Sequence, residues 1–123
     1  MSYNKLVRDK IPDIIKNNGE EPIVKILPFD EYKRELERKL QEELNETVEA
    51  SGIDRIEELA DMLEVMISLA KLENKTLDDI IDYCNKKHEK RGGFQKRLYL
   101  CGVKKVSHKW YFGDLWKIKH HWY

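Results

Sequence analysis

The stretch from Lys39 to Met66 constrains the fold of this chain most, because it places two acidic helix patterns on either side of one turn signal. Before the turn, Glu43 and Glu46 stand three residues apart, and after it Glu58 and Asp61 repeat that spacing. Residues three apart share one face of a helix. The sequence therefore predicts two helices, each with a pair of carboxylates on one face.

The turn between these helices is predicted from residues that suit helix ends. Gly52 fits the left-handed position after a helix, and Asp54 fits an N-cap with Glu57 at capping-box spacing. In an antiparallel hairpin closed by this turn, Glu46 and Glu58 each lie about one helical turn from it. The other two acids then pair one turn further in. All four carboxylates converge if both pairs face the same side.

Four converging carboxylates repel one another unless a cation lies between them. Asp61 has Glu57, Glu58 and Glu64 at helical neighbour positions, with no Lys or Arg among them. Like charges at this spacing destabilise a helix by a few tenths of a kcal/mol per pair. A bound divalent cation would turn the repulsion into coordination, and carboxylate oxygens favour Mg²⁺, with Mn²⁺ also possible, over Zn²⁺. The alternative is a solvated acidic face on an ordinary helical hairpin.

Charge is distributed unevenly along the 123 residues, which fit one domain with a small core. Residues 29–74 hold 6 basic and 14 acidic side chains, whereas residues 75–123 hold 12 basic and 5 acidic ones. This distribution suits a metal site facing a polyphosphate-binding wall. It suits internal charge pairing equally well.

The chain carries no targeting signal that we can identify. No apolar run approaches the roughly 20 residues of a membrane span, and the N-terminus lacks the apolar stretch of a signal peptide. We therefore expect a cytoplasmic protein with no membrane partner. Cys84 and Cys101 are too few for a disulfide framework, so we expect two reduced thiols.

Apolar periodicity predicts three long helices, at residues 30–50, 55–72 and 77–90. The first has an apolar stripe with strict four-residue spacing, which predicts one amphipathic face: Tyr32, Leu36, Leu40, Leu44 and Val48. The second is apolar on much of its circumference and needs more than one partner. In a chain this short, we expect one of those partners to be another subunit.

Shorter elements are predicted near the two ends of the domain. Pro12 fits the first turn of a short helix at residues 13–17. Residues 22–28 are rich in β-forming residues between two prolines and predict a strand. Its partner would be residues 97–103, in a two-stranded antiparallel ribbon or across a subunit boundary. The expected fold is thus mainly α: a helical hairpin and a third helix in a bundle completed by a second subunit, with a small β element.

Three basic segments each allow two interpretations. Residues 8–10 are either a surface charge run or an arm that reaches an anionic ligand. Residues 90–100 contain two glycines among Arg and Lys, which could cradle phosphates or simply end a helix. Residues 104–123 hold 5 basic residues, 1 acidic residue and several aromatic ones. These aromatic side chains could stack on bases or cover an exposed edge of the core.

These motifs together resemble a known group of enzymes. KLQEELNE followed by EELADML resembles the ExxE and ExxD signature of the MazG-like, all-α nucleoside triphosphate pyrophosphohydrolases. YNKLVRDKIP and RGGFQKRLYL resemble the phosphoribosyl-ATP pyrophosphohydrolase-like, house-cleaning branch of that superfamily. The resemblance covers roughly residues 2–100. We therefore expect a pyrophosphohydrolase domain at residues 1–103, followed by a basic aromatic tail at 104–123 with no assigned role.

The resemblance implies Mg²⁺-dependent cleavage between the α- and β-phosphates of a nucleoside triphosphate, which gives a nucleoside monophosphate and pyrophosphate. It implies that Glu43, Glu46, Glu58 and Asp61 are metal ligands. It also implies homodimers or homotetramers, with helical bundles completed between subunits. The expected role is house-cleaning of the nucleotide pool.

Further residues are candidates for the chemistry that this reaction needs. Glu42 could accept the proton of the attacking water, or could be plain surface charge. The candidates for substrate binding are the cations Arg8, Lys39, Arg91 and Lys96, with Phe94 beside the base. One alternative function is hydrolysis of phosphoribosyl-ATP in histidine synthesis. Another is a non-enzymatic helical binding module whose tail holds nucleic acid or a protein, whereas the enzymatic hypothesis expects no nucleic-acid partner.

Overall fold

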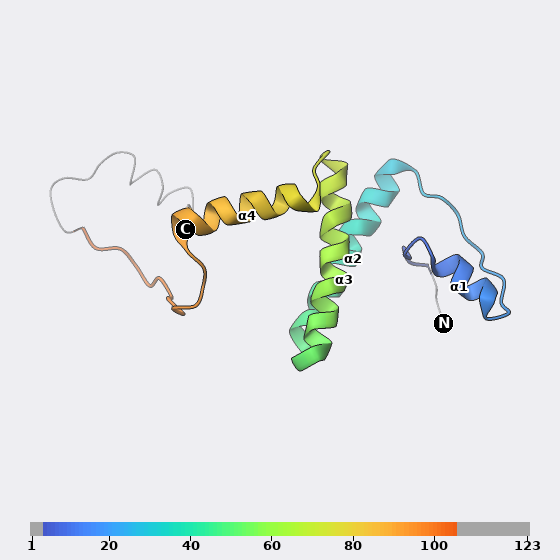
Figure 1. The fold of residues 1–123 in the computed structure, drawn as a ribbon, viewed down its shortest axis with the longest axis horizontal. Helices are drawn as coiled ribbons and strands as arrows, with labels where there is room; N and C mark the ends of the chain where they lie inside the picture. Colours follow the sequence, from blue (N-terminus) through green and yellow to red (C-terminus); the bar gives the residue numbers. More distant parts are fainter. Residues whose placement is uncertain (1–3, 106–123) are drawn as a thin grey trace. The chain divides into compact units, whose positions relative to one another are not determined.

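The fold consists of helices and irregular connections, as a computed structural model that describes residues 4–105 shows (Figure 1). The helices are α1 (Ile11–Asn17), α2 (Phe29–Glu49), α3 (Gly52–Leu72) and α4 (Leu77–Arg91). The mainly α prediction is therefore confirmed. No helix in this part of the chain is long and apolar enough to cross a membrane.

The chain divides into two compact units, Met1–Ile80 and Ile81–Tyr123, with the boundary inside α4. The first unit contains α1 and the α2–α3 pair, and the second begins within α4. The expected domain end at residue 103 stays a prediction, because the tail after residue 105 lies outside the described residues.

Helices α2 and α3 pack side by side as the predicted hairpin (Figure 1). Each has 21 residues, so each is about 30 Å long. Their equal length and two-residue connection bring the same levels of the two helices together. Leu36 of α2 and Val65 of α3 are the buried apolar side chains among the described residues. The hairpin therefore rests on a small core.

The hairpin turn is closed in a different way from the one predicted. Gly52 does adopt the left-handed region, with a φ of 60°. The prediction of Asp54 as N-cap is wrong, because α3 begins at Gly52 and its N-cap position falls on Ser51. The Nε of Arg55 donates a hydrogen bond to the backbone carbonyl of Ala50 at 2.8 Å. This bond ties the first turn of α3 to the end of α2.

The predicted apolar stripe of α2 divides between two faces. Leu36 is buried, whereas Leu44 is 42% exposed and Val48 is 68% exposed. With 3.6 residues per turn, a four-residue step advances about 40° around the helix, so three steps turn the stripe well away from its start. Glu43 and Thr47 are buried instead. The Thr47 hydroxyl donates to the Glu43 backbone carbonyl at 2.7 Å.

Helix α3 also presents apolar side chains to solvent in the single chain. Ile56, Leu59, Leu63 and Met66 are exposed, at alternating steps of three and four residues. Helical periodicity places them on the side of the hairpin that also carries the exposed Leu44 and Val48 of α2. We call these residues the exposed apolar face: Leu44, Val48, Ile56, Leu59, Leu63 and Met66.

Helix α4 begins with a cap at Thr76 and ends at Gly92, close to the predicted limits 77–90. The Thr76 hydroxyl accepts a hydrogen bond from the Asp79 backbone N–H at 3.2 Å, and the Asp79 carboxylate accepts one from the Thr76 N–H at 2.8 Å. This reciprocal pair caps the first turn, and the hydrogen bonds lower the pKa of Asp79. At the other end, Gly92 has a φ of 81° and stops the helix.

The predicted β element does not form within residues 4–105, where the structure contains no strand. Residues 22–28 are irregular, with Ile23 100% exposed and Ile26 98% exposed. Residues 97–103 are also irregular and belong to the other unit. A strand needs hydrogen bonds from a partner, and neither segment has one among the residues that the structure describes. Pairing of either segment across a subunit boundary stays a prediction.

Candidate metal centre

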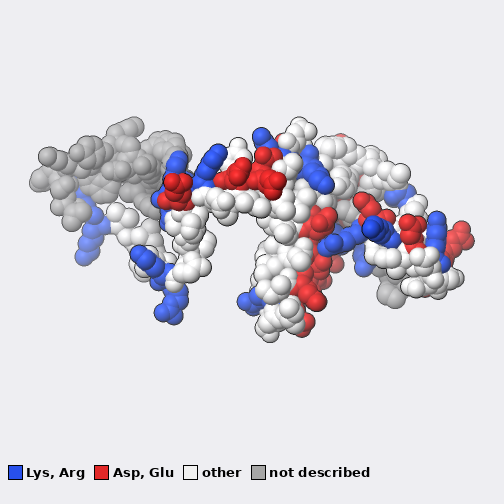
Figure 2. Space-filling view, viewed as in Figure 1, with Lys and Arg blue, Asp and Glu red and all other residues white. Residues whose placement is uncertain are grey.

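Three of the four predicted ligands come together between the two long helices. Glu43 of α2 and the pair Glu58 and Asp61 of α3 each offer a carboxylate oxygen, and these oxygens lie within 4.8 Å of one another. The three-residue spacing on α3 and the hairpin turn bring them to one level. Figure 2 shows acidic side chains gathered in a band along the hairpin. We call Glu43, Glu58 and Asp61 the carboxylate cluster.

Glu43 is the most buried member of the cluster, with only 7% of its surface exposed. Its Oε2 atom is buried without a hydrogen-bond partner among the described residues, and so is Oε2 of Glu58. A buried, unpaired carboxylate oxygen is unfavourable. Such a group either takes up a proton or meets a cation. This burial distinguishes Glu43 from a solvated surface carboxylate.

The surroundings of Glu43 favour its protonated form when no cation is bound. Burial raises the pKa of Glu43 from its ordinary 4.5 to about 7, and the negative charges of Glu46 and Asp61 add to the rise. The positive charge of Lys39 acts in the opposite direction. Near neutral pH, Glu43 thus changes charge readily, and a cation would release its proton.

Glu46, the fourth predicted ligand, lies at the edge of the cluster. It is exposed and does not belong to the group of three convergent oxygens. A hydrogen bond between the side chains of Glu46 and Glu58 is nevertheless the largest cause that raises the pKa of Glu58, followed by burial. Glu46 is therefore close enough to share a proton with Glu58.

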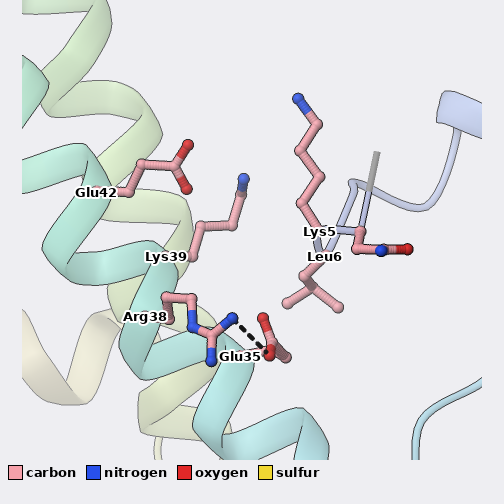
Figure 3. Close-up of a pocket in the computed structure, with 7 residues that line it drawn as sticks. Lys5, Leu6, Glu35, Arg38, Lys39 and Glu42 are labelled. Carbon is pink, nitrogen blue, oxygen red and sulfur yellow. Dashed lines mark ion pairs between the residues drawn. The ribbon is translucent and has the colours of Figure 1, made fainter. Parts of the chain in front are cut away.

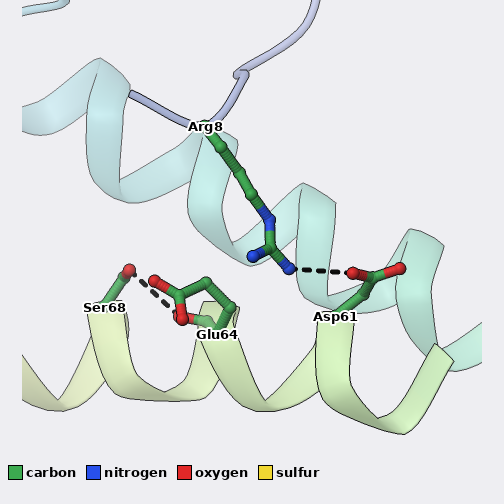
Figure 4. A network of polar contacts seen from close by, with 4 residues as sticks. All are labelled: Arg8, Asp61, Glu64 and Ser68. Carbon is green, nitrogen blue, oxygen red and sulfur yellow. Dashed lines mark hydrogen bonds and ion pairs between the residues drawn. The ribbon is translucent and has the colours of Figure 1, made fainter. Parts of the chain in front are cut away.

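The N-terminal arm, residues 4–10, reaches the cluster from outside the hairpin. The Nη2 atom of Arg8 lies 2.8 Å from Oδ1 of Asp61 (Figure 4). Both side chains are about half exposed, at 55% and 46%. Arg8 therefore pairs with a carboxylate of the protein itself, and the interpretation of residues 8–10 as an arm that reaches an anionic ligand stays a prediction.

A cavity of about 230 Å³ lies between the arm and α2 (Figure 3). Two candidates from the sequence, Glu42 and Lys39, line it. The full lining is Asn4, Lys5, Leu6, Glu35, Arg38, Lys39 and Glu42. Lys5 was not among the candidates, although it stands three residues before Arg8 in the same arm. Its proximity to α2 depends on the course of the arm, which the local sequence does not determine.

The other three substrate-binding candidates belong to the second unit. Arg91 ends α4, and Phe94 and Lys96 follow it in the irregular segment. Phe94 is 96% exposed in the single chain. Because each unit is described by itself, their proposed roles at the carboxylate cluster stay predictions.

The cluster has the donor chemistry of a site for a hard divalent cation. Its ligands would be carboxylate oxygens, with neither imidazole nor thiolate in the group, and this set suits Mg²⁺ or Mn²⁺ rather than Zn²⁺. Lys39 is near enough to influence Glu43 electrostatically. Carboxylates that could hold a cation thus lie near Lys39, a side chain that could hold an anion.

Comparison with known proteins adds one partial similarity. Over 42 residues the chain is 45% identical to an uncharacterized protein of Mycolicibacterium smegmatis. The match spans 34% of this chain and 43% of that relative. No family model matches the chain, and no solved structure matches it. The candidate function therefore rests on the carboxylate cluster and its surroundings.

Proposed function

We propose that this protein is a divalent-cation-dependent nucleoside triphosphate pyrophosphohydrolase of the MazG-like kind, which cleaves between the α- and β-phosphates. The observation that carries the proposal is the burial of Glu43 against Glu58 and Asp61, with two carboxylate oxygens left unpaired. The order of the sequence motifs, from YNKLVRDKIP through ExxE and ExxD to RGGFQKRLYL, supports the same family. House-cleaning of the nucleotide pool is the proposed role.

In this proposal Glu43, Glu58 and Asp61 hold Mg²⁺, with Glu46 as the fourth carboxylate. The cation would neutralise charge on the phosphate oxygens and orient a water. The oxygen of that water forms a bond to phosphorus, and the bond to the bridging oxygen breaks with its electron pair on the leaving group. Glu42, which lines the adjacent cavity, accepts the proton of the water.

Binding of the polyphosphate falls to cations near the cluster. Lys39 lines the cavity beside Glu42, and Arg8 already contacts the cluster through Asp61. Arg91, Lys96 and Phe94 of the second unit are the further candidates, with Phe94 beside the base. We also propose a homodimer or homotetramer, because the exposed apolar face leaves α3 without a full set of partners.

The proposal is tested by removing ligand charge without changing side-chain shape. Glu58→Gln and Asp61→Asn should each abolish Mg²⁺-dependent release of pyrophosphate from a panel of canonical and modified nucleoside triphosphates. Glu57→Gln is the matched control, because Glu57 is an exposed acid on the same helix and outside the cluster. It should retain activity.

Two readouts make the result decisive. Circular dichroism shows whether each variant keeps its helices, and separate assays for pyrophosphate and orthophosphate identify the bond that is cleaved. Retained activity in both folded cluster variants would remove the proposed site. Release of orthophosphate alone from the wild type would mean that a different bond is broken.

A further inference from the structure

The N-terminal arm contacts the hairpin at two places, one on each of its long helices. Lys5 and Leu6 face α2 across the cavity (Figure 3), and Arg8 reaches Asp61 of α3 (Figure 4). The arm is held to α1 by a hydrogen bond from the Ile11 N–H to the Arg8 carbonyl at 3.0 Å. The position of Arg8 is thus set by a short segment with few other bonds.

Arg8 is a cation that already occupies part of the carboxylate cluster. Its guanidinium makes the one ion pair with a cluster carboxylate among the described residues. A divalent cation bound by Asp61 together with Glu43 and Glu58 would stand next to this guanidinium, and two positive centres so close repel each other. Because Arg8 pairs with Oδ1 of Asp61, its positive charge opposes the binding of a metal at the same carboxylate.

An anion in the cavity between the arm and α2 would offer Arg8 an alternative partner, because Lys5 of the same arm and Lys39, which influences Glu43, both line that cavity. Lys5 and Lys39 both line this cavity, and neither makes an ion pair within residues 4–105. The Arg38 cation of the same lining is already paired with Glu35 at 3.4 Å. Two unpaired amino groups on the wall of a cavity suit a polyphosphate anion.

We propose that Arg8 is a positioning residue that exchanges partners: it pairs with Asp61 while the cluster is empty, and divalent cation binding releases it to the polyphosphate held by Lys5 and Lys39. The exchange rests on the proposed function, because it needs a metal at the cluster and a phosphate beside it. With this exchange, the arm becomes part of the substrate site, and Arg8 contacts the polyphosphate only after the metal has bound.

The proposal predicts effects of opposite sign from one substitution. In Arg8→Ala, Mn²⁺ binding measured by calorimetry should become about two- to five-fold tighter, because removal of an exposed ion pair to Asp61 frees the carboxylate. With Mn²⁺ saturating, binding of inorganic pyrophosphate should become about ten-fold weaker, because the released guanidinium is no longer available to the anion. Arg8→Lys should fall between the wild type and Arg8→Ala for pyrophosphate.

Arg38→Ala is the matched control, because it removes one positive charge from the same cavity wall without touching Asp61. Its affinity for Mn²⁺ should change less than that of Arg8→Ala. Equal tightening in both variants would mean that general electrostatics, not exchange of partners, explains the effect, and the proposal fails.

The remaining outcomes separate this proposal from the proposed function. If wild-type protein binds no Mn²⁺, both fall. If it binds Mn²⁺ but Arg8→Ala binds it no more tightly, the metal centre stands and the exchange is wrong. If Arg8→Ala binds Mn²⁺ more tightly and pyrophosphate equally well, Arg8 blocks the site without serving the substrate, which also overturns the exchange.

Discussion

At the scale of single residues, Glu43 determines how the hairpin responds to pH. Its pKa is about 7 in the folded chain and 4.5 for the ordinary carboxyl. Because the folded state holds the proton more tightly, the stabilising contribution is complete below pH 4.5 and is lost as the pH rises to about 7. A difference of this size corresponds to about 3 kcal/mol of unfolding free energy.

Glu43→Gln should therefore flatten the pH dependence of stability. In urea titrations without divalent cations, the wild type should lose unfolding free energy between pH 5 and pH 8, and Glu43→Gln should lose about 3 kcal/mol less over that interval. At pH 8, added Mg²⁺ should restore stability to the wild type and have little effect on the variant. If Glu43→Gln has the same pH profile of stability as the wild type, the carboxyl of Glu43 has an ordinary pKa.

A contact between residues of the site could be predicted from the sequence only where residues close in the chain determine it. Glu43, Glu58 and Asp61 were identifiable from sequence because helical spacing and one turn determine where they meet. The pairing of Arg8 with Asp61 was not, because the two residues are 53 positions apart and the course of the arm lies between them. The burial of Glu43 also depends on which face of α2 meets α3.

At the scale of elements, the three long helices form close to their predicted limits because caps, turns and apolar periodicity are local signals. The strand at residues 22–28 was predicted from composition and does not form, because its hydrogen bonds need a partner that the described part of the chain does not supply. The apolar stripe of α2 was predicted as one face, but its four-residue spacing winds around the helix.

The division of that stripe has a measurable consequence for stability. Leu36→Ala should lower the unfolding free energy by about 3 kcal/mol, because it removes one of the few buried apolar side chains of the hairpin. Leu44→Ala, the same substitution eight residues along the stripe, should cost about 1 kcal/mol or less in the monomer. Urea unfolding at low protein concentration compares the two, and equal losses would mean that the stripe is a single buried face.

At the scale of the whole molecule, the exposed apolar face has more apolar side chains than the buried core of the described residues. It comprises Leu44 and Val48 of α2 with Ile56, Leu59, Leu63 and Met66 of α3. Helical periodicity places it on the side of the hairpin away from Glu42 and the arm. Contiguous apolar patches of this kind mark interfaces. If this face were buried against a second copy of the chain, the carboxylate cluster would stay accessible to substrate.

We expect Leu63→Lys to dissociate the proposed homo-oligomer without unfolding the hairpin. A lysine at the middle of this face would be buried without a partner at the interface but solvated in the monomer. Light scattering coupled to size exclusion should show a dimer or tetramer for the wild type and a monomer for the variant, with helical circular dichroism retained. Glu57→Lys introduces the same side chain on α3 outside the face and should keep the wild-type mass. A monomeric wild type, or a Leu63→Lys variant of unchanged mass, would show that this face does not join subunits.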